Sequence, residues 1–394
     1  MSQSFTHPKI DATLKSAVDA GIVPGVVAMA TTDDGPCYAG AFGQRRLGSS
    51  TPMTLDTVFR IASMTKAITC VAAMQLVEQG KLSLDAPVPA IDPGLARPQV
   101  LDGFDAQGKP ILRPAKRPIT LKHLMTHTAG FCYEQWNPDL ERCVAALGTP
   151  QMATGKLAAL RMPLMFDPGE RWEYGINIDW IGRLVEEISG QKLDAYFAEH
   201  ITGPLGMKDT GFAASPEQRA RQATVHQRAA DETLTPQPFE IPTEREFLAG
   251  GGGLYCTAGD YLLFLQMLLQ AGTLNGARIL KPETVALMGQ NHIGALPAGV
   301  LKANWPEMTN DVDLFPGQQV RWGLAYMLTP QPGPNGRSAG SVTWAGIFNT
   351  YYWLDPVKQV AGVIMTQILP FADPATLGVL GDFERAVYTA IGEA

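Results

Sequence analysis

The sequence of 394 residues predicts an α+β fold, with an antiparallel sheet formed from both chain termini, flanking helices and an inserted, mainly helical region. Two groups of strand-like segments predict the sheet: residues 25–30 and 37–43 near one end, and residues 321–328, 341–345, 349–354 and 360–367 near the other. Turns within each group are short, and short turns join antiparallel strands. Because helical patterns fill the region between the groups, we expect one sheet assembled from the two termini.

The helical segments are predicted from apolar spacing. Residues 9–20 have the pattern of an amphipathic helix, and further helices are expected at 119–125, 178–189, 192–200, 261–269 and 375–391. Thr257 is a candidate N-cap for the helix that follows the glycine turn at 250–253. Residues 80–118 are rich in proline, so we expect mostly loop with short helices there. The expected domains are a sheet domain, residues 1–80 and 315–394, and a helical domain, residues 81–314, with the active site between them.

Composition argues against several function classes. The chain is 45% hydrophobic and has a net charge of -7 without a run of Lys or Arg, so nucleic acid and anionic membrane surfaces are not expected partners. No window suits a membrane span, and the first ten residues lack the pattern of a secretory signal. Five cysteines without C-x-x-C spacing argue against a disulfide framework and a zinc site. We expect a reduced, cytoplasmic protein without metal or cofactor.

The stretch at residues 59–66, Phe-Arg-Ile-Ala-Ser-Met-Thr-Lys, places Ser63 and Lys66 three residues apart at the start of an apolar helix. Residues three apart share a helix face, so hydroxyl and amine can form a hydrogen bond. Burial disfavours a charged amine, and the positive end of a helix dipole acts in the same direction. Lys66 can then accept the serine proton, while N–H groups at the helix start stabilise a negative oxygen. A bare Ser-x-x-Lys match is weak, and the apolar helix is what favours catalysis.

Tyr174 is the candidate group that carries the proton onward. It follows a Pro-Gly turn in a segment, residues 172–177, whose aromatic and polar side chains suit the wall of a cleft. Taken alone, a tyrosine in this setting is more often a packed core residue. Its interpretation as a catalytic group therefore depends on the other motifs of the chain.

Three motifs occur in order along the chain: Ser63-x-x-Lys66, Tyr174 within Pro-Gly-Glu-Arg-Trp-x-Tyr, and Trp-Ala-Gly at 344–346. Together they resemble the motifs of the class C β-lactamase-like superfamily, and within it they are most similar to the family VIII carboxylesterases. Similar stretches also occur at residues 124–130, 203–207 and 250–260. The resemblance extends over nearly the whole chain, from about residue 9 to residue 390.

This resemblance implies a serine β-lactamase and penicillin-binding-protein-like fold, with Ser63 as the acylated nucleophile. Lys66 with Tyr174 would form the general base system, and which of the two takes the first proton stays open. The strand at 344–346 would line the cleft. The backbone N–H groups of Ser63 and Ile347 would hold the oxyanion.

Two departures from true β-lactamases bear on the substrate. Trp344 and Ala345 replace the Lys and Thr of the Lys-Thr-Gly motif, and a neutral aromatic side chain suits an uncharged acyl or alcohol group. The asparagine expected after the tyrosine is replaced by Ile176, with Asn177 one position late. Efficient β-lactam hydrolysis is therefore not expected. The substrate-binding candidates are Trp344, Ala345, Gly346, Phe348, Asn177, Tyr133 and Trp136, and Phe131 is a further aromatic residue that could shape the acyl pocket.

Two other motifs offer rival chemistry. Residues 336–340, Gly-Arg-Ser-Ala-Gly, match the nucleophile elbow of α/β-hydrolases, but that elbow needs a strand before the serine and a helix after it. A Pro- and Gly-rich segment precedes Ser338 and a strand follows it, so we expect a turn instead. His127 has no metal-binding partner at helical spacing, and we expect a structural histidine bonded to its neighbouring turn. A Ser-Lys pair needs no histidine.

The sequence therefore predicts a serine carboxylesterase that hydrolyses short-chain acyl esters through an acyl-enzyme on Ser63, with a small-molecule ester as its partner. Three alternatives stay open. The first is a β-lactamase or D-amino-acid peptidase, and the second is an acyltransferase that passes the same acyl group to an alcohol. The third is a non-catalytic penicillin-binding relative.

Overall fold

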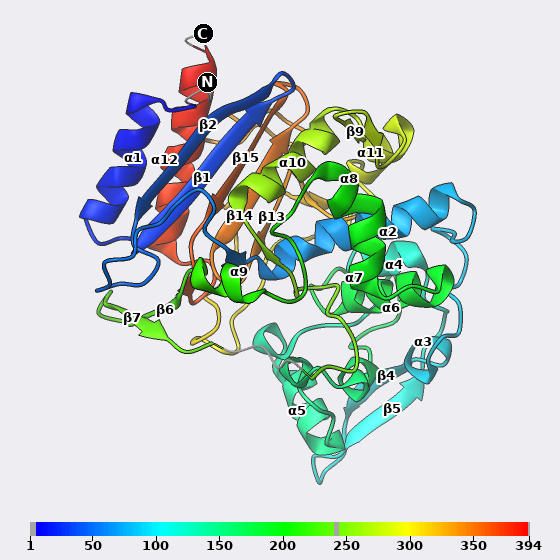
Figure 1. The fold of residues 1–394 in the computed structure, drawn as a ribbon. Coiled ribbons are helices and arrows are strands. Elements are labelled where there is room, and N and C mark those ends of the chain that lie inside the picture. Colours follow the sequence, from blue (N-terminus) through cyan, green and yellow to red (C-terminus); the bar gives the residue numbers. More distant parts are fainter. Residues whose placement is uncertain (1–4, 240–243, 393–394) are drawn as a thin grey trace.

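The two ends of the chain form one antiparallel sheet of seven strands in the computed structural model, which describes residues 5–239 and 244–392 (Figure 1). The strand order is β11-β12-β13-β14-β15-β1-β2. The strands are β1 (Gly25–Thr32), β2 (Gly35–Gly43), β11 (Arg321–Trp322), β12 (Met327–Thr329), β13 (Ser341–Gly346), β14 (Thr350–Asp355) and β15 (Val360–Met365). β1 pairs with β15 and places Ala28 opposite Ile364, so the expected α+β fold with a sheet from both termini is confirmed.

Helices cover both faces of this sheet. α1 (Pro8–Asp19) and α12 (Pro374–Gly392) pack against each other on one face, and α10 (Ala258–Leu269) packs against β1 and β15 from the other (Figure 1). Every residue of β13, β14 and β15 is buried, because helices remove both sides of these strands from water. The predicted cap of α10 is confirmed, since Thr257 Oγ1 accepts a hydrogen bond from the Asp260 N–H at 3.2 Å.

The helix that carries the Ser-x-x-Lys motif, α2 (Thr65–Glu78), crosses the centre of the molecule and packs on α6 (Asn177–Ser189) (Figure 1). Every residue of α2 from Thr65 to Leu76 is buried, which agrees with the burial on most sides that its mainly apolar sequence predicts. The helix ends before Gly80, whose φ of 70° is a left-handed conformation that glycine adopts without steric penalty. A helix enclosed on all sides holds the first turn, and the residues beside it, in a fixed place.

Shorter elements complete the fold. The remaining helices are α3 (Pro93–Ala96), α4 (Leu121–Met125), α5 (Pro138–Leu147), α7 (Leu193–Phe197), α8 (Gly203–Leu205), α9 (Pro216–Ala220) and α11 (Pro282–Met288). The remaining strands are β3 (Phe59–Arg60), β4 (Gln99–Phe104), β5 (Pro110–Pro114), β6 (Val225–Arg228), β7 (Leu234–Gln237), β8 (Tyr255–Cys256), β9 (Thr273–Leu274), β10 (Ala277–Arg278) and β16 (Ile368–Leu369). The division into domains at residues 80 and 315 stays a prediction.

One local prediction was incomplete and another was wrong, although residues 80–118 do contain a short helix, α3, as expected. Residues 80–118 contain the hairpin β4–β5, whose turn is held by Asp105 Oδ1, which accepts from the N–H groups of Gln107 and Lys109. Two of the prolines that suggested loop, Pro110 and Pro114, stand at the ends of β5, where a two-stranded ribbon tolerates a missing N–H. Residues 321–328 form two strands rather than one, because the chain turns where the Gly323 N–H donates to the Tyr326 carbonyl.

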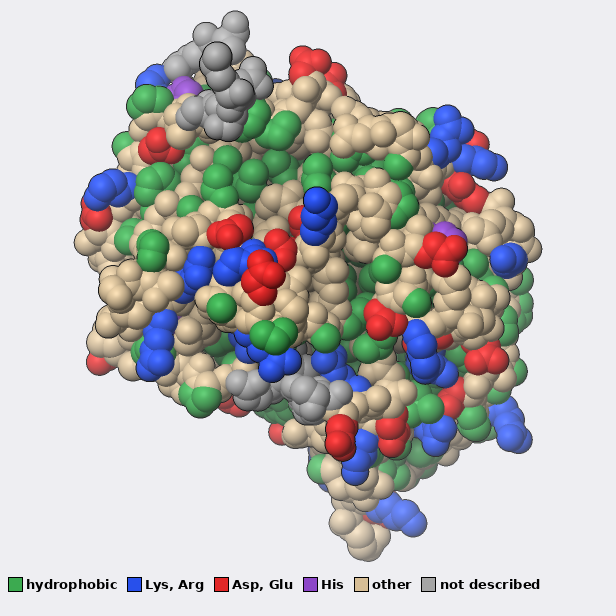
Figure 2. Space-filling view, in the orientation of Figure 1, with side chains coloured by type: hydrophobic (Ala, Val, Ile, Leu, Met, Phe, Trp, Pro, Cys, Tyr) green, Lys and Arg blue, Asp and Glu red, His purple; other side chains and the backbone are tan. Residues whose placement is uncertain are grey.

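The surface gathers no large patch of one charge on the face shown in Figure 2, where acidic and basic side chains are interspersed. This distribution fits the modest net charge of -7. Within residues 5–239 and 244–392, no helix has both the length and the apolar character that crossing a lipid bilayer requires.

Candidate active site

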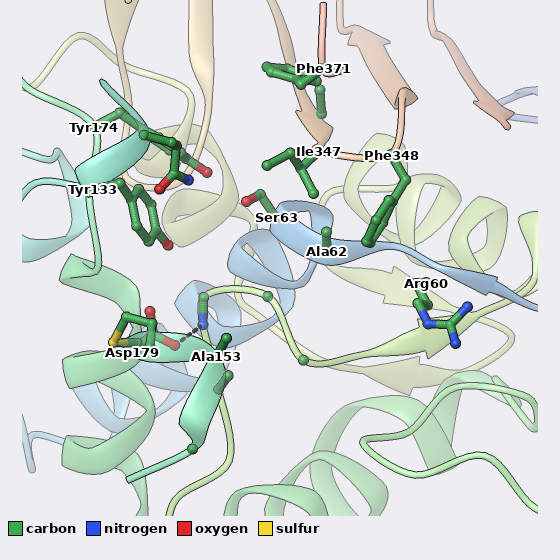
Figure 3. A pocket seen from close by; sticks show the side chains of 18 of the residues that line it. Arg60, Ala62, Ser63, Tyr133, Ala153, Tyr174, Asp179, Ile347, Phe348 and Phe371 are labelled. Atoms are coloured by element: carbon green, nitrogen blue, oxygen red, sulfur yellow. Dashed lines mark hydrogen bonds between the residues drawn. The ribbon is translucent and has the colours of Figure 1, made fainter. Parts of the chain in front are cut away.

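A cavity of about 290 Å³ opens where the start of α2 meets the end of β13 (Figure 3). Ser63 lies in its wall, and the aromatic side chains around it come from segments far apart in the sequence. Among the residues that line it are Arg60, Ala62, Ser63, Tyr133, Trp136, Met152, Tyr174, Asp179, Phe239, Phe247, Gly251, Trp344, Ala345, Ile347, Phe348 and Phe371. The cavity therefore brings the three predicted motifs together.

Ser63 is presented by a short 3₁₀ turn, η1 (Ala62–Met64), directly before α2. Ala62 in this turn has a φ of 42°, a left-handed conformation that is strained for a residue with a side chain. Two buried hydrogen bonds pin the turn from outside: Tyr261 Oη donates to the Met64 carbonyl, and the Leu254 N–H donates to Thr65 Oγ1. The serine is therefore held at the cavity by tertiary contacts and not by helix geometry alone.

Lys66 is 1% exposed, and its amine has three hydrogen-bond partners. Its Nζ donates to Ser63 Oγ at 3.1 Å, to Tyr133 Oη at 3.1 Å and to the Gly251 carbonyl at 2.5 Å. These three oxygen atoms compensate the burial of the Lys66 nitrogen. The predicted Ser63–Lys66 hydrogen bond is present in the structure.

Gly251 connects Lys66 to a buried carboxylic acid. The Gly251 N–H donates to Asp179 Oδ1 at 3.0 Å, the contact drawn as a dashed line in Figure 3. Burial raises the pKa of Asp179, although the charge of Lys66 and the Gly251 N–H act in the opposite direction. A side chain on Gly251 would collide with Asp179 Oδ2, so this peptide has to be glycine. Asp179 thereby positions the carbonyl that Lys66 contacts.

Tyr174 also lies beside Lys66, but its ring rather than its hydroxyl faces the amine. Lys66 Nζ is 4.8 Å from the centroid of the Tyr174 ring. The Tyr174 oxygen accepts a 2.9 Å hydrogen bond from Trp344 Nε1. Within the described parts of the chain, no hydrogen bond joins the Tyr174 hydroxyl to Ser63 or Lys66. The indole thus occupies the motif position of the β-lactamase lysine and supplies one hydrogen bond to the tyrosine.

His127 supports the segment that carries Tyr174. Its carbonyl accepts from the Glu173 N–H at 3.0 Å, and its ring Nδ1 accepts from the Gly175 N–H at 3.3 Å. The imidazole also lies against the Tyr174 ring, with 4.5 Å between centroids. Burial and then the charge of Lys66 lower the pKa of His127 well below its usual value, which keeps Nδ1 free to accept. These contacts fit the structural role predicted for this histidine.

The end of β13 packs directly against the nucleophile turn. A Cβ on Gly346 would collide with the Ile61 carbonyl and with Thr350 Oγ1, so only glycine permits this approach. The approach places Ile347 and Ser63 in the wall of the same cavity. The predicted oxyanion hole formed by their N–H groups stays a prediction.

The predicted pocket residues fall into two groups. Tyr133, Trp136 and Phe348 line the cavity, as do Trp344 and Ala345. Asn177, Phe131 and Gly346 are not among the lining residues. The Asn177 amide donates to the Phe131 carbonyl at 3.1 Å and lies 3.0 Å from His127 Nδ1, and both Asn177 and Phe131 are buried. The hydrogen bond to the Phe131 carbonyl therefore fixes the end of the Tyr174 segment.

Ser338 of the rival elbow motif lies away from the cavity, in the turn before β13. Its N–H donates to Asp355 Oδ2 at 2.8 Å, and a strand rather than a helix follows it. The nucleophile-elbow geometry therefore does not form here, and the prediction of a turn is confirmed.

Comparison with known proteins now identifies the family. Residues 10–381 match the family model described as Beta-lactamase. The chain belongs to this family. The resemblance seen in the motifs is thereby confirmed for the β-lactamase family as a whole.

Named relatives of this β-lactamase-family chain are acyltransferases and an esterase. It is 32% identical to ML-236A carboxylate methylbutanoyltransferase of Penicillium citrinum, over 97% of this chain and 94% of that protein. It is also 32% identical to lovastatin esterase of Penicillium rubens, over 96% of this chain and 98% of that protein.

Solved structures agree with the fold. The unliganded simvastatin synthase of Aspergillus terreus superposes with a TM-score of 0.85 at 30% identity, covering 98% of each chain. EstCE1, described as a hydrolase with promiscuous acyltransferase activity, superposes with a TM-score of 0.75 at 23% identity, over 97% of this chain and 98% of that one. The second likeness bears on the fold alone.

Sequence reasoning missed two residues of the β-lactamase-family site. Asp179 is in the first turn of α6, and Gly251 belongs to a glycine run that the sequence indicated only as a turn. The run of four glycines was the available signal, because such a run permits close approach of backbone to other groups. Its partner could not be found in the sequence, since Asp179 lies 72 positions away.

Proposed function

We propose that this chain is a serine carboxylesterase that hydrolyses short-chain acyl esters through an acyl-enzyme on Ser63. The observation that carries the proposal is the 3.1 Å hydrogen bond between Lys66 Nζ and Ser63 Oγ at the wall of the cavity. A base within hydrogen-bond reach of an alcohol is the arrangement that activates a serine nucleophile. In this proposal Lys66 and Tyr174 form the base system, and the N–H groups of Ser63 and Ile347 hold the oxyanion.

The preference for uncharged acyl groups is supported by the apolar residues of the cavity wall. Ile347, Phe348 and Phe371 lie together on one side of Ser63 (Figure 3). Trp344 stands where β-lactamases carry a lysine, so β13 offers no cation to a substrate carboxylate. Apolar walls with few polar groups suit acyl chains. On the same motif we place the chain with the family VIII carboxylesterases.

Acyl transfer to an alcohol is the second candidate. It is favoured by the relatives, because one is named a methylbutanoyltransferase and another an esterase at the same 32% identity. Both reactions share the acyl-enzyme and differ in whether water or an alcohol removes the acyl group.

Intact-mass spectrometry after brief exposure to a panel of esters tests the proposal. We expect the mass of the protein to rise by one acyl group with nitrophenyl acetate or butyrate, and Ser63→Ala to show no adduct and no turnover. Retained ester turnover in Ser63→Ala would refute it. Faster cleavage of nitrocefin than of the esters would favour a β-lactamase. Formation of a new ester on addition of an alcohol would favour acyl transfer.

A further inference from the structure

Two phenols lie beside the Lys66 amine, and they meet it in different ways. Tyr133 Oη accepts a hydrogen bond from Lys66 Nζ at 3.1 Å. Tyr174 presents its ring to the same atom, with the ring centroid at 4.8 Å, and its oxygen is bonded to Trp344 Nε1. The motif pattern singles out Tyr174, yet the hydroxyl that shares the amine with Ser63 belongs to Tyr133.

Tyr133 is held rigidly in this position. It precedes the short turn η2 (Glu134–Trp136), and its ring packs edge-on against Trp136 and tilted against Tyr174, with centroids 5.9 Å and 5.5 Å apart. The Tyr133 oxygen already accepts from Lys66, so its own proton is available to another group. Among the described residues none accepts that proton, and Tyr133 lines the cavity. The Tyr133 O–H can therefore donate to a bound substrate.

We propose that Tyr133 is a second catalytic residue, which relays a proton between Lys66 and the oxygen of the leaving or accepting alcohol. The inference rests on the acyl-enzyme function proposed above. In acylation, Ser63 Oγ forms a bond to the ester carbonyl and gives its proton to the neutral Lys66 amine. As the carbon–oxygen bond to the leaving alcohol breaks, Tyr133 gives its proton to that oxygen and takes one from Lys66 Nζ.

Deacylation runs the same path in reverse. Water or an alcohol attacks the acyl carbonyl and gives its proton to Tyr133, which passes its own proton to Lys66. The Lys66 ammonium then returns a proton to Ser63 Oγ as the serine ester bond breaks. Each cycle leaves all three groups in their starting protonation states. The sum is one ester and one water or alcohol converted to an acid or new ester and a released alcohol.

Electrostatics fit a relay that passes protons without storing charge. Burial, and then the negative charge of Asp179, raise the pKa of the Tyr133 phenol well above its usual value. A phenolate is therefore disfavoured. The Tyr133 oxygen has to gain one proton at the same time as it gives up its own. The short path from Ser63 through Lys66 to Tyr133 permits this.

Tyr133→Phe tests the relay, because it removes only the hydroxyl. Nitrophenolate leaves without needing a proton, whereas an alkoxide must be protonated. We expect the acylation burst with nitrophenyl butyrate to stay within about 3-fold of wild type. Acylation by ethyl butyrate and the steady-state hydrolysis of both esters should fall about 100-fold, which is the size of a general acid-base contribution. Intact mass should show acyl-enzyme accumulating with the nitrophenyl ester only.

The matched control is Tyr326→Phe, which removes a buried hydroxyl that has no hydrogen-bond partner among the described residues and should leave both esters unaffected. The inference is overturned if Tyr133→Phe slows acylation by both esters equally, since a packing role would do that, or if it changes neither. Failure of the proposed function is a separate result: wild type would then form no acyl-enzyme with either ester.

Discussion

The two sides of the cavity are built from different interactions. On the Lys66 side, one amine is hydrogen-bonded to Ser63, Tyr133 and Gly251, which come from three separate segments. On the Trp344 side, aromatic rings pack together: Trp344 lies 4.8 Å from both Tyr174 and Trp322, centroid to centroid, and makes one hydrogen bond to Tyr174. Hydrogen bonds hold the first side together, whereas ring packing holds most of the second. Loss of a single atom should therefore cost more on the first.

The largest effect is expected from Lys66→Met, which keeps the volume of the side chain and removes the amine. We expect ester turnover to fall by about 10³-fold or more, because the only amine bonded to Ser63 in the described site is lost. Nitrophenyl butyrate hydrolysis measures this. Lys122→Met, which removes a surface ion pair with Asp85, is the control and should retain activity. Near-normal turnover in Lys66→Met would show that the Lys66 side does not carry the proton transfer.

A smaller loss is expected from Gly346→Ala, at the place where the two sides meet. The added methyl group collides with the Ile61 carbonyl and Thr350 Oγ1, so β13 has to move away from the nucleophile turn. We expect turnover to fall about 100-fold, a loss typical of misplaced reacting groups, and stability to fall by about 1–3 kcal/mol.

The control for this change is Gly378→Ala in α12, where an added Cβ meets nothing within 4 Å. It should keep full activity and gain a few tenths of a kcal/mol in stability. Turnover assays and urea unfolding compare the two variants. Equal turnover and equal stability of Gly346→Ala and Gly378→Ala would contradict the close contact at Gly346.

Trp344→Phe isolates the one hydrogen bond of the aromatic side. The ring contact with Tyr174 largely remains, while the N–H donor to Tyr174 Oη is lost. We expect about a 10-fold loss of kcat, which matches the 1–1.5 kcal/mol of a single hydrogen bond. Trp322→Phe is the matched control, because Trp322 Nε1 has no hydrogen-bond partner within residues 5–239 and 244–392. Equal losses in both variants would mean that ring packing, and not the N–H group, matters.

The smallest effect concerns pH and stability. Burial lowers the folded-state pKa of His127 well below the unfolded value near 6.5, so the unfolded chain takes up the proton first. The stability contribution is complete above about pH 6.5 and is lost as pH falls toward the folded pKa, by at most about 1.4 kcal/mol per pH unit. His123 and His226 act in the same direction. Urea unfolding at pH 7.5 and 5.5 measures the change.

His127→Asn removes this titrating group at a position whose φ of 56° an asparagine tolerates. We expect the variant to lose less stability than wild type on acidification. An identical pH dependence in both proteins would show that His127 does not contribute.

Local sequence was sufficient where one segment contains the whole pattern. The apolar run behind Ser63 and Lys66 predicted a buried helix, and α2 is buried from Thr65 to Leu76. Strand segments with short turns predicted the antiparallel sheet. The hairpin β4–β5 was missed because a high density of prolines indicates loop. Composition does not show that two of these prolines stand at the ends of a strand.

The sequence by itself determined the fold class, the family motifs and the pairing of Ser63 with Lys66, because each is inferred from local patterns whose own residues are close together along the chain. Only the tertiary structure decided which hydroxyl shares the amine. Tyr133 lies 67 positions from Lys66, and the Trp344–Tyr174 hydrogen bond spans 170 positions. Contacts of that kind leave no periodic signal in the sequence, since they depend on how separate elements pack and on where close approach is sterically allowed.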